Sequence, residues 1–193
     1  MKVLITALIL AGFVWALNSC GPAKTDTASI TTDAPSKDSL IKRGNYLVTT
    51  IGCNDCHSPK KMGPQGPFVD TARMLSGSPA GAPPPVASAE DVKNHQIVFS
   101  GDLTAVVGPW GTSFSANITS DATGIGNWTL DQFKNAIRHG KYMGLKEERM
   151  LLPPMPWEEL GVLNDADMEA IFTYLKSTKP VKNVVPSPKP PGK

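Results

Sequence analysis

The chain carries the stretch Cys53-Asn54-Asp55-Cys56-His57, a Cys-x-x-Cys-His motif that occurs once in its 193 residues. The motif has three rival interpretations. A structural zinc site needs four ligands, and the sequence has neither a second cysteine pair nor two closely spaced histidines. A thioredoxin-like redox pair requires a βαβ context, whereas a helical pattern precedes this motif. A disulfide between the two cysteines stays open, but it leaves the histidine unexplained.

The spacing matches the signal for covalent attachment of a c-type haem. Two thiols separated by two residues can add to the two vinyl groups of the haem, and the adjacent histidine then lies beneath the iron as its proximal ligand. We therefore predict one covalent haem c, held by Cys53 and Cys56, with His57 as an axial iron ligand.

The second axial position decides the chemistry of such an iron. A methionine there raises the reduction potential and closes the iron, whereas an open position favours ligand binding or peroxidase-like work. The best candidate is Met155, in the segment LPPMPW at 152–157. The flanking prolines fix φ and remove backbone donors, so they can hold a loop thioether in place. The alternatives are two methionines and two histidines, namely Met143, Met150, His95 and His139.

Three segments carry apolar residues at helical spacing, at 40–51, 129–140 and 164–179. The first segment runs directly into the cysteine motif. The second begins with a capping box at Thr129 and stops at a glycine that is suited to a helix end. The third has Asn164 as its predicted N-cap, and a proline ends it.

A long stretch rich in glycine and proline, 58–127, separates the motif from the second predicted helix. Strand-like pieces occur at 96–100 and 112–118. A loop of this length is unusual in a compact domain, but a haem is a large apolar disc that supplies core surface to the loops around it. The expected class is therefore mostly α, with three or more helices around one haem and a long ordered loop insertion that has room for short strands.

The N-terminal residues predict export. Residues 1–19 combine an early lysine with an apolar run that is too short to span a bilayer comfortably, which is typical of a secretory signal. The run ends at Leu17-Asn18-Ser19-Cys20, which resembles the lipobox of bacterial lipoproteins. Cys20 is therefore the predicted lipidation site. A plain signal peptide that leaves Cys20 as a spare thiol, and an uncleaved anchor, are the alternatives.

Composition sets the remaining boundaries. Residues 20–37 have almost no large apolar side chain and predict a flexible tether. Residues 179–193 contain five prolines and four lysines and predict an extended, disordered tail. The folded domain is therefore expected at 38–178. The formal net charge of +2 gives no indication of a nucleic-acid partner.

The order of these features resembles class I cytochrome c: a helix, the Cys-x-x-Cys-His motif, a long loop, a helix, Pro-Met-Pro and a C-terminal helix. More narrowly, the segments NIT (117–119), TGIGNW (123–128) and PMPW (154–157) resemble the cytochrome domains in multihaem subunits of bacterial membrane-associated dehydrogenases. In such domains the methionine of the Met-Pro motif is the sixth iron ligand, which implies that role for Met155. Those subunits usually carry several haem motifs, whereas this chain has one, so we expect a stand-alone carrier or a single-domain partner.

The resemblance also implies that the N- and C-terminal helices cross, with a small residue on one helix accepting an aromatic residue from the other. Gly44 with Phe172 or Tyr174 fits that arrangement. Two lysines follow the motif closely, Lys60 and Lys61. They suggest a basic rim that steers an acidic partner, and solvated lysines on a loop are the alternative. Donor side chains that can stabilise buried haem propionates are further candidates, namely Arg73, Trp110, Asn117 and Trp128.

Together these features predict an electron carrier rather than an enzyme, with iron that cycles between its ferrous and ferric states. The expected partners are redox proteins such as a dehydrogenase or a terminal oxidase. The expected location is the periplasmic side of a membrane, where the lipid on Cys20 holds the protein. The alternative function is a haem enzyme or sensor, peroxidase-like or gas-binding, with an open or displaceable sixth iron site.

Overall fold

The computed structural model describes residues 34–191 of the chain. The predicted signal segment, Cys20 and most of the predicted tether lie outside the described residues. In that part, none of the helices is long and apolar enough to cross a bilayer. The helices are α2 (Lys37–Ile51), α3 (Cys53–His57), α4 (Ala89–Lys93), α5 (Leu130–His139), α6 (Trp157–Leu160) and α7 (Asp165–Ser177); the strands are β1 (Lys60–Gly63), β2 (Gly66–Val69), β3 (Val98–Phe99), β4 (Ala105–Gly108) and β5 (Gly111–Phe114); the short 3-10 helices are η1 (Thr71–Arg73) and η2 (Tyr142–Gly144).

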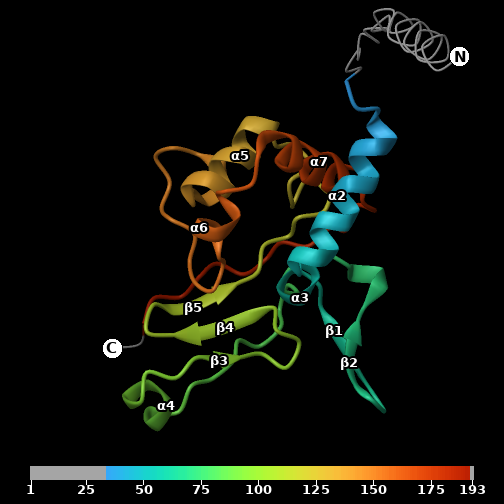
Figure 1. Ribbon diagram of the computed structural model, residues 1–193. Coiled ribbons are helices and arrows are strands. Elements are labelled where there is room, and N and C mark those ends of the chain that lie inside the picture. The colour runs from blue at the N-terminus through green and yellow to red at the C-terminus, as the bar shows by residue number, and fades with distance from the viewer. Residues whose placement is uncertain (1–33, 192–193) are drawn as a thin grey trace, which may run out of the picture. The chain divides into compact units, whose positions relative to one another are not determined.

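Helices α2 and α7 cross at close range (Figure 1). A Cβ on Gly44 of α2 would overlap the backbone oxygen of Ala170 and lie 2.6 Å from Cβ of Tyr174. The two helix backbones can therefore approach this closely only because residue 44 has no side chain. The predicted crossing is confirmed, with Tyr174 as the aromatic partner of the glycine. Phe172 packs instead against Phe133 of α5, with the ring centroids 5.4 Å apart.

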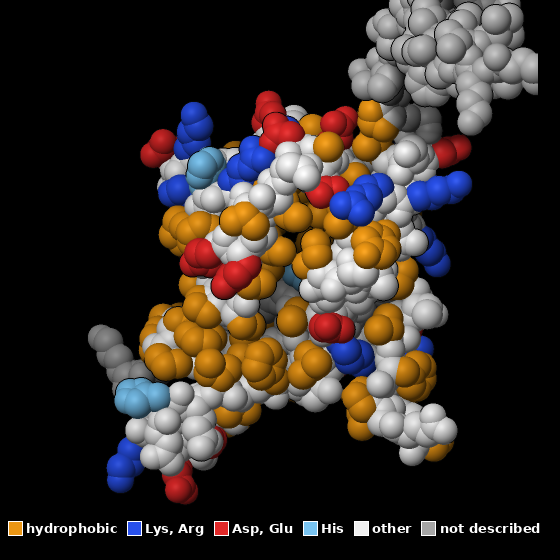
Figure 2. All heavy atoms as spheres, in the orientation of Figure 1, with side chains coloured by type: hydrophobic (Ala, Val, Ile, Leu, Met, Phe, Trp, Pro, Cys, Tyr) orange, Lys and Arg blue, Asp and Glu red, His pale blue; other side chains and the backbone are white. Residues whose placement is uncertain are grey.

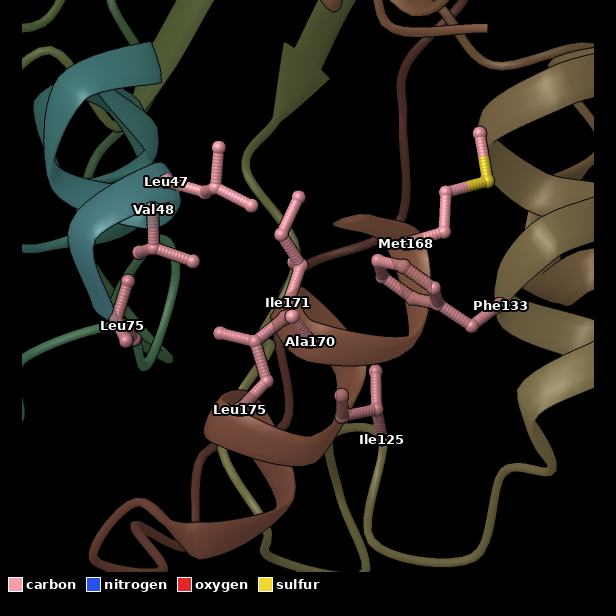
Figure 3. Packing of buried hydrophobic residues seen from close by; sticks show 9 residues of the cluster. All are labelled: Leu47, Val48, Leu75, Ile125, Phe133, Met168, Ala170, Ile171 and Leu175. Carbon is pink, nitrogen blue, oxygen red and sulfur yellow. The ribbon is translucent and has the colours of Figure 1, made fainter. Parts of the chain in front are cut away.

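The hydrophobic core lies where α2, α5 and α7 meet, and two loop residues complete it (Figure 3). Fully burying a large aliphatic side chain stabilises a fold by about 1.5–3 kcal/mol, so this cluster holds the helical part together. Its nine buried members are Leu47, Val48, Leu75, Ile125, Phe133, Met168, Ala170, Ile171 and Leu175.

The predicted starts of α5 and α7 are confirmed. Thr129 and Gln132 form the capping box, in which each side chain accepts a hydrogen bond from the backbone N–H of the other residue, and α5 ends at Gly140. Asn164 is the N-cap of α7, and its side chain accepts from the N–H of Asp167. These caps satisfy N–H groups that have no partner inside the helix.

Two small antiparallel sheets occupy the stretch between α3 and α5 (Figure 1). Strands β1 and β2 form a hairpin, and β3, β4 and β5 form a three-stranded sheet in that order. The predicted strand pieces at 96–100 and 112–118 correspond to β3 and β5, whereas β1, β2 and β4 were not predicted. Each missed strand is four residues long and contains a glycine, so it offers too few alternating positions for a pattern. The described fold mixes helices with small sheets, and the expectation of a mostly α class is not confirmed.

The C-terminal segment 178–191 lies along the domain, unlike the predicted disordered tail. Lys189 exchanges two backbone hydrogen bonds with Thr112 of β5, at 3.0 and 2.8 Å. Asn183 binds three backbone groups of residues 76–80 through its side-chain amide. A composition rich in proline prevents helix and sheet within the segment, but it leaves backbone and amide groups that other loops can bind.

Candidate haem-binding site

Helix α3 presents the cysteines and the histidine of the motif in little more than one turn. It follows α2 directly, and only Gly52, with a φ of 84°, separates the two helices. Cys53 and Cys56 are both free thiols. Within residues 34–191, no group of three or more His, Cys, Asp or Glu side chains is placed to hold a metal ion. The disulfide and zinc interpretations of the motif therefore find no support in this part of the chain.

The two thiols stay protonated at neutral pH. Burial raises the pKa of Cys53 to about 11, and burial also raises the pKa of Cys56, against the opposing charge of Lys60. A thiolate is disfavoured away from water, so both groups are S–H. Because an S–H that adds across a vinyl double bond gives a thioether and releases nothing, this pair fits the attachment chemistry of a haem.

The His57 ring is held through one of its two nitrogens. Nδ1 lies 2.8 Å from the carbonyl oxygen of Ala116. A carbonyl oxygen only accepts hydrogen bonds, so Nδ1 carries the proton and Nε2 of the neutral ring has a lone pair. Burial lowers the pKa of His57, which favours the neutral ring, and the hydrogen bond to Ala116 opposes that change. A neutral imidazole with its lone pair at Nε2 is the form that ligates a metal.

Two loops bracket His57. The backbone N–H of Gly77 donates to the carbonyl oxygen of His57 at 2.8 Å, and the N–H of Ser78 donates to the carbonyl oxygen of Ser115 at 2.9 Å. Gly77 has a φ of 75°, and a Cβ there would lie 2.6 Å from the carbonyl oxygen of Ala116. The loop at 75–78 therefore touches both the backbone of the histidine and the carbonyl group that orients its ring.

Ser58 ties the end of α3 to the first of these loops. Its hydroxyl donates to Oδ1 of Asn54 at 2.9 Å and accepts from the N–H of Leu75 at 2.8 Å. Ser58 and Leu75 are both fully buried. Ser58, Gly77 and Ala116 were not predicted from the sequence. The last two act through backbone groups that every residue type provides. Only the position of Ser58 directly after the motif was a usable signal.

Met155 is half-buried in the loop that precedes α6. Its N–H donates to the carbonyl oxygen of Leu152 at 3.3 Å, and its own carbonyl accepts from Trp157 at 2.9 Å. The hydroxyl of Ser113 in β5 donates to the carbonyl oxygen of Pro153 at 2.6 Å. Hydrogen bonds within the loop and to β5 therefore hold its backbone in place. A fixed backbone is what a loop that carries an iron ligand needs.

The alternative iron ligands lie in different settings. Met143 and Met150 are 44% and 41% exposed, on either side of the loop that follows α5. His139 is the last residue of α5. His95 lines a small cavity beside α4, together with Val92 and other apolar residues. As axial ligands these four residues stay alternatives to Met155.

The face of the molecule in Figure 2 is hollowed at its middle. Hydrophobic side chains gather around this hollow, both on the helical part and on the sheet beneath it (Figure 2). An apolar hollow of this kind suits a large, flat, mostly apolar cofactor.

The four predicted propionate contacts have partners within the protein. Arg73 Nε donates to the Asp70 carboxylate at 2.9 Å, and Trp110 Nε1 donates to a serine hydroxyl of β5 at 3.3 Å. The buried Asn117 amide binds the backbone of the C-terminal segment, and Trp128 packs against the hydrophobic core. As haem contacts these residues stay predictions, and each has a structural role of its own.

The two lysines after the motif are not free charges. Lys60 Nζ donates to the backbone carbonyl oxygens of Asp55, Ser58 and Asp102, at 2.6, 3.1 and 3.0 Å. Lys61 forms an ion pair with Asp70 at 3.1 Å. Lys60 thus binds backbone around the motif, whereas Lys61, 57% exposed in its pair with Asp70, stays part of the predicted basic rim.

Comparisons with known proteins point to one class of redox protein. No protein-family model matches the chain. Over 143 residues, 74% of its length, the chain is 33% identical to the gluconate 2-dehydrogenase cytochrome c subunit of Pantoea cypripedii, and it covers 24% of that protein. Over 151 residues, 77% of its length, it is 30% identical to the fructose dehydrogenase cytochrome subunit of Gluconobacter japonicus, and it covers 23% of that protein.

A further relative is the cytochrome c subunit of the quinone-dependent alcohol dehydrogenase of Gluconobacter oxydans. It is 30% identical over 146 residues, which are 75% of this chain and 23% of that protein. The chain thus spans about a quarter of the length of these curated relatives. Relatives of this chain are cytochrome c subunits of bacterial dehydrogenases, and the similarity supports a cytochrome c domain that carries haem c and serves electron transfer.

Proposed function

We propose that residues 38–178 are a cytochrome c domain that attaches one haem c through Cys53 and Cys56, ligates its iron through His57 and Met155, and passes electrons between redox partners. The observation that carries the proposal is the hydrogen bond from Nδ1 of His57 to the carbonyl oxygen of Ala116, at 2.8 Å. It directs the lone pair of the ring to Nε2, where a metal ligand needs it.

Each part of the site has a separate task in this function. When bound, the haem supplies an iron that exchanges one electron between its ferrous and ferric states. Cys53 and Cys56 keep the cofactor from dissociating, because a thioether is covalent. The loops at 75–78 and 115–117 hold His57 in one orientation, and the apolar side chains around the hollow exclude water. The chain moves no proton and transfers no group in this function.

Covalent attachment is tested by expressing the full chain together with a bacterial haem-attachment machinery. The wild-type protein is expected to keep its haem after denaturation and acid–acetone extraction. The double variant Cys53→Ala/Cys56→Ala is expected to lose haem under the same treatment, while Cys20→Ser retains it. Extraction of all haem from the wild type would overturn the proposal.

Met155 as the sixth ligand has a spectroscopic test. A ferric low-spin haem with a methionine ligand has a weak absorption band in the far red. Met155→Ala is expected to abolish this band and to allow rapid binding of cyanide, whereas Met143→Ala and Met150→Ala leave the band unchanged. If the wild type lacks the band and binds cyanide or CO rapidly, the enzyme or sensor function replaces the carrier function.

For the partner we infer a dehydrogenase, because three relatives are named as cytochrome subunits of dehydrogenases. A cytochrome c domain can pass electrons on from such an enzyme without binding its substrate. The test is affinity purification of the holoprotein from its native membranes, followed by identification of what copurifies. Reduction of the haem when the substrate of the copurified enzyme is added supports the inference, and a complex without any oxidoreductase contradicts it.

For the location we infer export and a lipid anchor at Cys20 on the periplasmic side of a membrane. This inference rests on the sequence alone, because Cys20 lies outside the described residues. Cys20→Ser is expected to move the protein from the membrane fraction to the soluble fraction, whereas Ser29→Ala in the tether leaves it with the membrane. An unchanged distribution of Cys20→Ser would contradict the anchor.

A further inference from the structure

Asn117 connects the loop that orients His57 to the C-terminal segment. It directly follows Ala116, is only 4% exposed, and uses its whole side-chain amide in hydrogen bonds. Nδ2 donates to the carbonyl oxygen of Val181 at 2.8 Å and to Oγ1 of Thr123 at 3.1 Å. Oδ1 accepts from the N–H of Thr119 at 3.0 Å. The position of the Ala116 carbonyl group is therefore tied to residues more than 60 positions further along the chain.

Asn183 connects the same segment to the second loop. Its Nδ2 donates to the carbonyl oxygens of Ser76 and Ser78, at 2.7 and 2.9 Å. Its Oδ1 accepts from the N–H of Ala80 at 2.9 Å. Ser76 and Ser78 are each 1% exposed, so these bonds are shielded from water. Between the two bonded serines lies Gly77, whose N–H holds the backbone of His57.

Thr123 joins the two amides. Its Oγ1 accepts from the backbone N–H of Asn183 at 2.9 Å and from Nδ2 of Asn117 at 3.1 Å. We call Asn117, Thr123 and Asn183 the amide clamp. It links both loops that bracket His57, one through the Ala116 carbonyl group and the other through Gly77.

We propose that the amide clamp is a positioning device that sets the strength of the hydrogen bond from Nδ1 of His57, and through it the affinity of Nε2 for ferric iron. The inference rests on the proposed function, in which His57 is an iron ligand. Donation of the Nδ1 proton to a carbonyl group makes a ligating imidazole more basic. A more basic ligand favours the ferric over the ferrous state, so a loosened clamp raises the reduction potential.

A clamp that served only the stability of the fold would behave differently. Its loss would lower the free energy of unfolding but leave the redox equilibrium of the folded protein unchanged. Asn164→Ala provides the matched control, because this N-cap of α7 is also an asparagine whose Oδ1 accepts a backbone hydrogen bond, from Asp167 at 2.8 Å. It makes no hydrogen bond to either loop around His57. The control thus removes an amide without touching the clamp.

The experiment uses the full chain with attached haem and compares the wild type with Asn183→Ala, Thr123→Val and Asn164→Ala. For each protein the ferrous-to-ferric ratio is measured across a potentiometric titration, and the paramagnetically shifted NMR signals of the axial histidine ring are recorded. Asn183→Ala and Thr123→Val are expected to raise the ferrous-to-ferric ratio at a fixed potential about threefold or more, which is about 28 mV where tenfold is 59 mV. Both are also expected to move the histidine signals, whereas Asn164→Ala leaves the ratio and the signals unchanged.

The possible failures are distinguishable. If the wild type carries no covalent haem, the proposed function fails. If haem is attached but both clamp variants keep the wild-type potential and histidine signals, the clamp inference is wrong and the proposed function stands. If Asn183→Ala yields no folded holoprotein, Thr123→Val decides alone. It keeps both amides and removes the hydroxyl that accepts from them, which also donates to Oδ1 of Asp121 at 2.6 Å.

Discussion

At the scale of single residues, the orientation of His57 depends on its neighbours' backbones more than on their side chains. The Ala116 carbonyl group accepts from the ring, and the Gly77 N–H binds the histidine backbone. Gly77 is required here for two reasons: its φ of 75° disfavours residues that have a Cβ, and a Cβ would lie 2.6 Å from the Ala116 oxygen. A side chain at residue 77 would therefore strain the loop and crowd the Ala116 oxygen that accepts the hydrogen bond from His57.

Gly77→Ala is therefore expected to lower the free energy of unfolding by more than about 1 kcal/mol and to reduce the yield of holoprotein. The measurement is denaturant unfolding of the purified protein, together with the ratio of haem to protein. Gly101→Ala is the control, since a Cβ at Gly101 meets no atom within 4 Å and its φ is outside the left-handed region. If both variants had the same free energy of unfolding and the same haem content, the loop at 75–78 would accommodate a Cβ without loss of stability, and the prediction would be wrong.

At the scale of elements, the carboxylate of Asp70 anchors the base of the β1–β2 hairpin through ion pairs. Asp70 is only 5% exposed. It pairs with Arg73 at 2.9 Å and with Lys61 of β1 at 3.1 Å, and its Oδ1 also accepts from the N–H of Ala72. The hydrogen bond from Arg73, followed by the contact with Lys61, lowers the pKa of Asp70 although burial opposes the change.

Asp70→Asn is expected to lower the free energy of unfolding at pH 7. Because the folded pKa lies below the ordinary value of 3.8, the ionised carboxylate stabilises the fold above about pH 4. That contribution disappears as the pH falls through the lower, folded pKa. The difference between wild type and variant, measured by urea unfolding from pH 7 down to pH 2, should therefore narrow only below about pH 4.

Glu147→Gln serves as the control for this measurement. Glu147 is exposed, and the described part of the chain offers it no ion pair. Its substitution should leave the unfolding free energy nearly unchanged across the same pH range. A constant difference between Asp70→Asn and the wild type down to pH 2 would contradict the assigned role of the carboxylate.

At the scale of the whole molecule, the C-terminal segment connects parts of the fold that are remote in sequence. It leaves α7, binds the loop at 117–123, then the loop at 76–80, and finally β5 through Lys189. The α2–α7 crossing and the core hold the helices together, and Leu75 anchors the loop at 75–78 in that core. The C-terminal segment adds hydrogen bonds to the loops on both sides of His57.

Removal of residues 181–193 is expected to lower the free energy of unfolding by more than about 3 kcal/mol, because seven hydrogen bonds at Val181 and Asn183 are lost at about 0.5–1.5 kcal/mol each. Removal of 186–193 cuts the pairing of Lys189 with Thr112, keeps the bonds at Val181 and Asn183, and should cost less. Guanidinium unfolding of the two truncated holoproteins and the wild type measures both effects. Equal stability of the two truncations would mean that the amide clamp contributes nothing to the fold.

The sequence alone was sufficient for features that depend on neighbouring residues. The Cys-x-x-Cys-His spacing, the capping box at Thr129, the N-cap at Asn164 and the period of α2 are local signals, because their interacting groups lie within a turn of each other. These signals predicted three of the helices at the observed places and indicated the kind of site. Lipidation at Cys20, iron ligation by Met155 and haem attachment at the cysteine pair stay predictions from the sequence.

Only the tertiary structure decided the internal bonding of Lys60, the short strands, the course of the C-terminal segment and the hydrogen bond that orients His57. The C-terminal segment, the His57 ring and Lys60 each bind a partner far along the chain, whereas the strands pair with close neighbours; in most cases the partner is a backbone N–H or C=O group. Such groups are the same in every residue, so no sequence pattern marks them. The motif identifies His57 from the sequence, but only the hydrogen bond to Ala116 determines that Nδ1 carries the proton and Nε2 keeps the lone pair.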